Sequence, residues 1–166
     1  MRHRILVVDD DNDNIKSTRL FLEDAGYDID FATSGAEAIT KIQNDSKGFS
    51  VIILDYRMPG KNGVETAKDI RSFNEESVVL MYSGDDSRET LKEALRIGGV
   101  IDFIDKSESS DELLEAVKKA CTQYEEVYQL LRPHVPKTMS EEFLKSIGLV
   151  AASRSMHDVA MQVFNY

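Results

Sequence analysis

Five short apolar runs, spread over the first 104 residues, constrain the fold of this chain more than any other feature. Residues 5–8 and 51–54 contain no polar position at all, as expected of strands that are buried on both faces. We therefore predict strands at residues 5–8, 27–31, 51–54, 78–81 and 100–104.

The segments after these runs carry apolar residues at helical spacing, and capping and turn residues separate them. Gly26 is expected to end the first helix, Ser34 to cap the second, and residues 59–63 to form a loop before the third. The apolar faces are Ile15, Thr18, Leu22 and Ala25; then Ala38, Ile39 and Ile42; then Val64, Ala67 and Ile70; then Leu91, Ala94 and Leu95. A long helix is expected from about Ser110.

Alternating strands and helices predict an α/β fold, a doubly wound five-stranded parallel sheet with helices on both faces. In such sheets, binding sites lie beyond the carboxyl ends of the strands. Residues at those ends are therefore the candidates for function.

Charged and hydroxyl side chains occupy four of the five strand ends. Asp9 and Asp10 follow the first strand, Asp55 the third, Ser83 the fourth and Lys106 the fifth. A single aspartate there would be explained by helix capping. Carboxylates from two neighbouring strands, however, would repel one another without a cation, and oxygen ligands alone favour Mg²⁺. A lysine opposite them suits an oxyanion.

Four segments carry a family resemblance. Residues 7–11 (VVDDD), 54–60 (LDYRMPG), 82–84 (YSG) and 103–106 (FIDK) resemble, in order and spacing, the signature segments of response-regulator receiver domains. The resemblance covers residues 1 to about 125 and implies a flavodoxin-like fold. It implies a signalling switch, not an enzyme with its own substrate, that takes a phosphoryl group from a histidine kinase.

The resemblance also implies a role for each matching residue. Asp55 would accept the phosphoryl group. Asp10 would bind Mg²⁺ directly and Asp9 largely through water, and Asp55 and the main-chain carbonyl of Arg57 would complete the protein ligands.

Three further residues match positions that respond to phosphorylation in this family. Lys106 would contact the phosphoryl group, and Ser83 would donate a hydrogen bond to it and draw the following loop inward. Phe103 matches the switch aromatic, although a core phenylalanine on a strand explains it equally well.

The sequence departs from the family pattern after Lys106, where Ser107 replaces the usual proline. A cis bond before a residue other than proline costs about 2.5–4 kcal/mol. We expect either a trans bond with a reshaped loop or a strained cis bond. A second hypothesis is that Arg57 and Asp85 flank the acyl phosphate and prolong its lifetime, so that Arg57→Ala would change the dephosphorylation rate.

The helix that begins near Ser110 has an apolar stripe longer than the sheet can cover. Its members are Leu113, Val117, Ala120, Tyr124, Val127 and Leu131, with Leu114, Cys121 and Tyr128 beside them. Sustained heptad spacing favours a homodimer through residues 110–131. The alternative is one long core helix with two solvent-facing tyrosines. Cys121, the single cysteine, is expected to serve packing rather than chemistry.

The chain is expected to divide into a receiver domain, residues 1–125, and a helical dimerisation or linker extension, residues 126–166. Residues 132–140 indicate a linker, and a short helix is predicted from Ser140 to Gly148. Residues 149–159 resemble the opening of the AAA+ domain of sigma-54-dependent activators, although Ala151 replaces a glycine of that pattern. An ordinary amphipathic tail helix explains them equally well.

Composition and motifs limit the other functions open to this chain. A net charge of −10 without a Lys/Arg cluster disfavours nucleic-acid binding, and no apolar run approaches a membrane span, so we expect a cytoplasmic protein. A pseudo-receiver that only binds partners would normally lack the acidic pair or the lysine. A haloacid-dehalogenase-like phosphatase would have a second aspartate where Arg57 stands.

Overall fold

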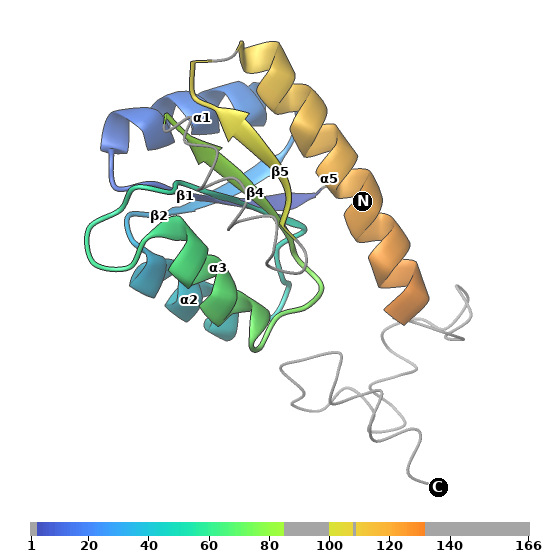
Figure 1. Cartoon of the computed structure of the whole chain (residues 1–166). Helices are drawn as coiled ribbons and strands as arrows, with labels where there is room; N and C mark the ends of the chain where they lie inside the picture. Colours follow the sequence, from blue (N-terminus) through green and yellow to red (C-terminus); the bar gives the residue numbers. More distant parts are fainter. Residues whose placement is uncertain (1–2, 85–99, 108, 132–166) are drawn as a thin grey trace, which may run out of the picture. The chain divides into compact units, whose positions relative to one another are not determined.

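A computed structural model describes residues 3–84, 100–107 and 109–131 of this chain (Figure 1). The chain divides into two compact units, Met1–Tyr128 and Gln129–Tyr166. The first unit contains the whole sheet. The predicted helix through Leu91, Ala94 and Leu95, the residue Asp85 and the segments after residue 131 all lie outside the described residues.

The sheet has five parallel strands in the order β2-β1-β3-β4-β5. Its strands are β1 (Arg4–Val8), β2 (Asp28–Ala32), β3 (Val51–Leu54), β4 (Val78–Ser83) and β5 (Val100–Asp105). The predicted fold class is confirmed, with strand ends that differ from the prediction by one or two residues. β1 and β3 are neighbours, so their carboxyl ends lie side by side.

Four helices are described, and polar side chains cap the first three. They are α1 (Asn12–Asp24), α2 (Gly35–Asn44), α3 (Gly63–Arg71) and α5 (Ser110–Leu131). Asp11, Ser34 and Asn62 each accept a hydrogen bond from a backbone N–H of the first turn. The prediction that Ala25 belongs to the buried face of α1 was wrong, because the helix ends at Asp24 and Ala25 is its exposed C-cap.

Two hydrophobic cores lie on opposite faces of the sheet (Figure 1). Helices α2 and α3 cover one face through Ala38, Ala67 and Ile70, and α1 and α5 cover the other through Leu22 and Val117. β1 and β3 send alternate residues to each core, which explains why their sequences are apolar throughout.

Most of α5 packs on this second core. Leu113, Val117, Ala120 and Cys121 are buried, and burial raises the pKa of the Cys121 thiol to about 12, as expected of a packing residue. Further along, His3 hydrogen-bonds Ser50 and Glu125, both at 3.1 Å, and its ring meets Tyr124 edge-on. The side chains of residues 127–131 lie outside the described set.

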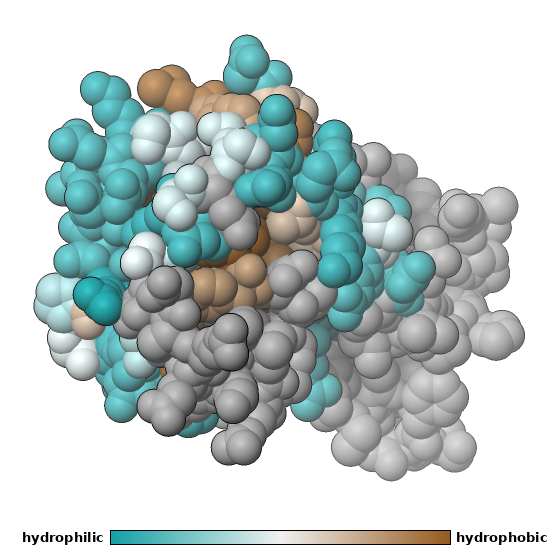
Figure 2. Space-filling view, turned by 45° about the horizontal axis from the view of Figure 1, so that its top comes forward, coloured by the Kyte–Doolittle hydropathy of each residue, from teal (hydrophilic) through white to brown (hydrophobic). Residues whose placement is uncertain are grey.

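Hydrophilic side chains surround a smaller apolar area on the face shown in Figure 2. Leu20 and Phe73 are the exposed large hydrophobic residues in the described ranges. Within the same ranges, no helix is both long and apolar enough to cross a membrane.

Candidate functional site at the carboxyl ends of the strands

Three aspartates meet where β1 and β3 end. The Asp55 N–H donates to the Val8 carbonyl at 2.8 Å, which aligns the two strand ends. One carboxylate oxygen from each of Asp9, Asp10 and Asp55 lies within 4.8 Å of the others. Asp9 and Asp55 are 4% and 5% exposed, whereas Asp10 faces solvent. The three carboxylates therefore form a cluster that is open on one side.

Lys106 brings a positive charge from the end of β5 to this cluster. Its Nζ lies 2.5 Å from Asp9 Oδ2 and 3.2 Å from Asp55 Oδ1. Its backbone N–H donates to the Ser83 carbonyl at 3.1 Å, which joins the ends of β4 and β5. The sequence predicts a lysine that faces a bound oxyanion, and the structure adds that its shortest contact is with Asp9.

The other predicted site residues lie at different distances from this cluster. Ser83 is 1% exposed, and its side chain hydrogen-bonds that of Asp55. Phe103 is partly buried against the core under α2 and α3, a position compatible with either of its two interpretations. The side chain of Arg57 is exposed. Its hypothetical partner Asp85 lies outside the described residues.

Burial and the contact between opposite charges act in opposite directions on the pKa values of Asp55 and Lys106. Burial, reinforced by the negative charge of Asp9, raises the pKa of Asp55 despite the opposing effects of Lys106 and Ser83. Burial alone would lower the pKa of Lys106, but its hydrogen bond to Asp9 and the charge of Asp55 outweigh it and raise that pKa. Lys106 therefore stays charged, and Asp55 ionises at a cost.

The donor set suits a hard divalent cation. All the side-chain candidate ligands are carboxylate oxygens, and one ammonium against three carboxylates leaves two negative charges unbalanced. Oxygen ligands with an excess of negative charge are what Mg²⁺ requires. The residues present therefore fit the ion that the sequence predicts.

Gly63 is a residue of this site that the sequence analysis missed. It begins α3, and its N–H donates to the Tyr56 carbonyl at 2.9 Å. A Cβ at this position would stand 2.3 Å from the Asp55 carbonyl oxygen and 2.7 Å from the Met81 methyl group. The helix can approach the Asp55 backbone only without a side chain here. The sequence signal that could have identified it is a glycine at the point where the predicted loop meets the third helix.

We expect Asp55→Asn to stabilise the protein near neutral pH in the absence of Mg²⁺. Because the folded-state pKa of Asp55 is raised, its stabilising contribution is present below the unfolded pKa and is lost as pH rises through the folded value. The asparagine variant has no carboxyl group to ionise and therefore avoids the cost of a buried negative charge. Thermal unfolding should show a higher Tm for Asp55→Asn at pH 7, and the difference should shrink as pH falls towards 4. A lower Tm for the variant at pH 7 would contradict the expectation.

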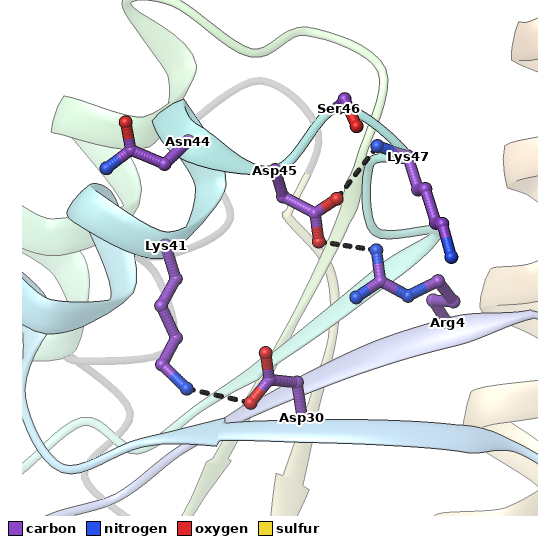
Figure 3. A pocket seen from close by; sticks show the side chains of 7 residues that line it. All are labelled: Arg4, Asp30, Lys41, Asn44, Asp45, Ser46 and Lys47. Atoms are coloured by element: carbon purple, nitrogen blue, oxygen red, sulfur yellow. Dashed lines mark hydrogen bonds and ion pairs between the residues drawn. The ribbon is translucent and has the colours of Figure 1, made fainter.

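A polar hollow of about 400 Å³ lies away from this cluster, between β1, β2 and the end of α2 (Figure 3). Arg4 pairs with Asp45 and stacks on Phe49, 4.7 Å from the ring centroid, while Lys41 pairs with Asp30 at 2.7 Å. Because these charges satisfy one another, the hollow ties strands to helix and needs no ligand to explain it.

Comparisons with known proteins agree with this geometry. The family model described as "Response regulator receiver domain" matches residues 5–118. The transcriptional regulatory protein ZraR of Klebsiella oxytoca is 34% identical over 152 residues, covering 92% of this chain and 32% of that protein. The chain thus spans about a third of the length of this curated relative.

Solved structures share the fold. A CheY-like receiver domain protein from Methanospirillum hungatei matches with a TM-score of 0.70 and 28% identity, covering 76% of this chain and 98% of that one. The response regulator protein TrrA of Thermotoga maritima, solved in complex with Mg(2+)-BeF, matches with a TM-score of 0.64 and 31% identity, covering 71% and 98%.

The sheet order, the helices on both faces and the acidic cluster define a flavodoxin-like receiver fold. The chain belongs to the response-regulator receiver domain family. Receiver domains are signalling modules of two-component systems, in which they interact with histidine kinases, and they bind Mg²⁺ at an acidic pocket.

Proposed function

We propose that Asp55 is the phosphoryl acceptor of this receiver domain and that a histidine kinase is the donor. The observation that carries the proposal is the convergence of three carboxylates and Lys106 at the ends of β1, β3 and β5. A carboxylate oxygen of Asp55 attacks phosphorus in line, forming an O–P bond as the bond from phosphorus to the donor imidazole breaks.

The neighbouring residues have distinct parts in this transfer. Lys106 holds a positive charge beside the phosphoryl oxygens, and the Ser83 hydroxyl donates a hydrogen bond to one of them. Asp10, Asp55 and the Arg57 carbonyl would hold Mg²⁺, with Asp9 acting through water. When bound, the ion would supply positive charge that neutralises the nucleophile and the phosphoryl oxygens.

We expect one phosphoryl group on the wild-type chain after incubation with acetyl phosphate and Mg²⁺. Intact mass spectrometry should detect it, and both Asp55→Asn and removal of Mg²⁺ with EDTA should abolish it. Asp69→Asn removes a carboxylate of α3 that forms an exposed ion pair with Lys61, and this matched control should be labelled like the wild type. Failure of the wild type with every small donor would instead favour a pseudo-receiver that only binds partners.

The output of the switch is proposed to be transcription. The relatives named as transcriptional regulatory proteins, and the resemblance of residues 149–159 to sigma-54-dependent activators, support residues 126–166 as a linker into an AAA+ domain. A net charge of −10 supports protein partners rather than nucleic acid, in the cytoplasm.

A homodimer through residues 110–131 is part of the same proposal. The apolar stripe of α5 already packs on the sheet as far as Tyr124, so the pairing surface would lie beyond it. Light scattering of the full chain should give a dimer, and Val127→Glu with Leu131→Glu should give a monomer that still accepts a phosphoryl group. A wild-type chain that stays monomeric at about 100-fold the concentration used for the phosphorylation measurement would contradict the pairing.

A further inference from the structure

The turn after β5 is built differently from the usual lysine–proline turn of this family. None of the described peptide bonds is cis, so the Lys106–Ser107 bond is trans. Ser107 also has a backbone N–H, which a proline would lack, and this N–H donates to Asp105 Oδ1 at 2.7 Å. The Ser107 hydroxyl hydrogen-bonds the same carboxylate, and the Ser107 N–H holds the pKa of Asp105 below its usual range.

Hydrogen bonds hold the chain both before and after Lys106. Before it, the Lys106 N–H donates to the Ser83 carbonyl at 3.1 Å. After it, the chain enters α5 through a reciprocal cap, in which Ser109 and Glu112 exchange hydrogen bonds of 3.2 and 3.4 Å. Between these anchors, the Asp105–Ser107 hydrogen bond closes the turn that carries the Lys106 side chain.

We propose that Asp105, through Ser107, is a positioning residue that aims the Lys106 ammonium at Asp9 and Asp55. Without this bond the turn gains conformational freedom, and the ammonium spends less time within reach of both carboxylates. The rate consequence rests on the proposed function, in which Lys106 contacts the phosphoryl group. Asp105 itself touches neither the phosphoryl group nor the metal ligands.

Asp105→Ala removes the acceptor, whereas Asp105→Asn removes the charge and keeps an oxygen that can accept from Ser107. We expect Asp105→Ala to slow phosphorylation by acetyl phosphate about three- to tenfold, because loss of orientation lowers the rate without removing a reacting group. Asp105→Asn should retain most of the wild-type rate. Glu115→Ala, which removes an exposed carboxylate 2.9 Å from Lys118 on α5, is the charge-matched control and should be unchanged.

Two further measurements separate positioning from loss of structure. The Mg²⁺ dissociation constant and the Tm of Asp105→Ala should stay near wild type, because the metal ligands and both cores are untouched. A full rate in Asp105→Ala, or an equal loss in Asp105→Asn, would overturn the proposal.

The chemical shift of the Lys106 side-chain nitrogen tests the position of the ammonium independently of phosphorylation. This chemical shift should change in Asp105→Ala and stay near the wild-type value in Asp105→Asn. If the wild type accepts no phosphoryl group, the proposed function fails, while this shift still decides the positioning. An unchanged shift in Asp105→Ala would overturn the positioning even in a chain that is phosphorylated normally.

Discussion

Lys106→Met is expected to slow phosphorylation of Asp55 by about 100-fold, the loss that follows removal of one preorganised donor to a developing charge. Lys106 contacts both buried carboxylates, at 2.5 Å for Asp9 and 3.2 Å for Asp55. Methionine keeps most of the length of the side chain and removes the ammonium. Rates measured by intact mass over time, with acetyl phosphate at saturating Mg²⁺, would show the effect.

The affinity for Mg²⁺ separates this result from a general loss of structure. Because the Lys106 ammonium competes with a cation for Asp9 and Asp55, its removal should leave Mg²⁺ binding as tight as in the wild type, or tighter. Lys118→Met, which removes an exposed cation paired with Glu115, is the matched control. A Lys106→Met rate within threefold of wild type would contradict the role given to the ammonium.

Gly63→Ala is expected to destabilise the fold by about 1–3 kcal/mol or more, the usual cost of forcing extra atoms into a packed region. The added Cβ would meet the Asp55 carbonyl oxygen at 2.3 Å and the Tyr56 Cα at 2.9 Å. Both are backbone atoms, so relief requires α3 or the end of the β3 segment to move. The midpoint of urea unfolding should fall, and displacement of Asp55 should weaken Mg²⁺ binding as well.

Gly84 offers a matched control for this substitution. No atom of the described residues lies within 4 Å of a Cβ built there, and neither glycine has the positive φ that would strain an alanine. Gly84→Ala should therefore unfold at the wild-type urea concentration, and the difference between the two variants isolates the cost of the close approach at Gly63. Equal midpoints would show that α3 can shift without cost, contrary to the packing described above.

The fold was predictable because its signals are local. An apolar run of four residues such as 51–54 identifies a strand buried on both faces, and Ser34 or Gly26 marks a helix boundary by its own backbone chemistry. Errors arose at element ends, as with Ala25, where apolar character continued for one residue beyond the helix. The strand-end rule then placed Asp9, Asp10 and Asp55 at one edge without any knowledge of side-chain positions.

Contacts between side chains distant in sequence required the tertiary structure. The sequence alone determined which residues stand at the carboxyl ends of the strands, because uniformly apolar runs mark buried strands and their alternation with helices implies a parallel sheet. Only the structure decided that Lys106 lies nearest Asp9, that Asp105 closes the turn beside it and that Gly63 has no room for a Cβ. These contacts depend on how α3, β4 and β5 pack together, which local sequence patterns do not specify.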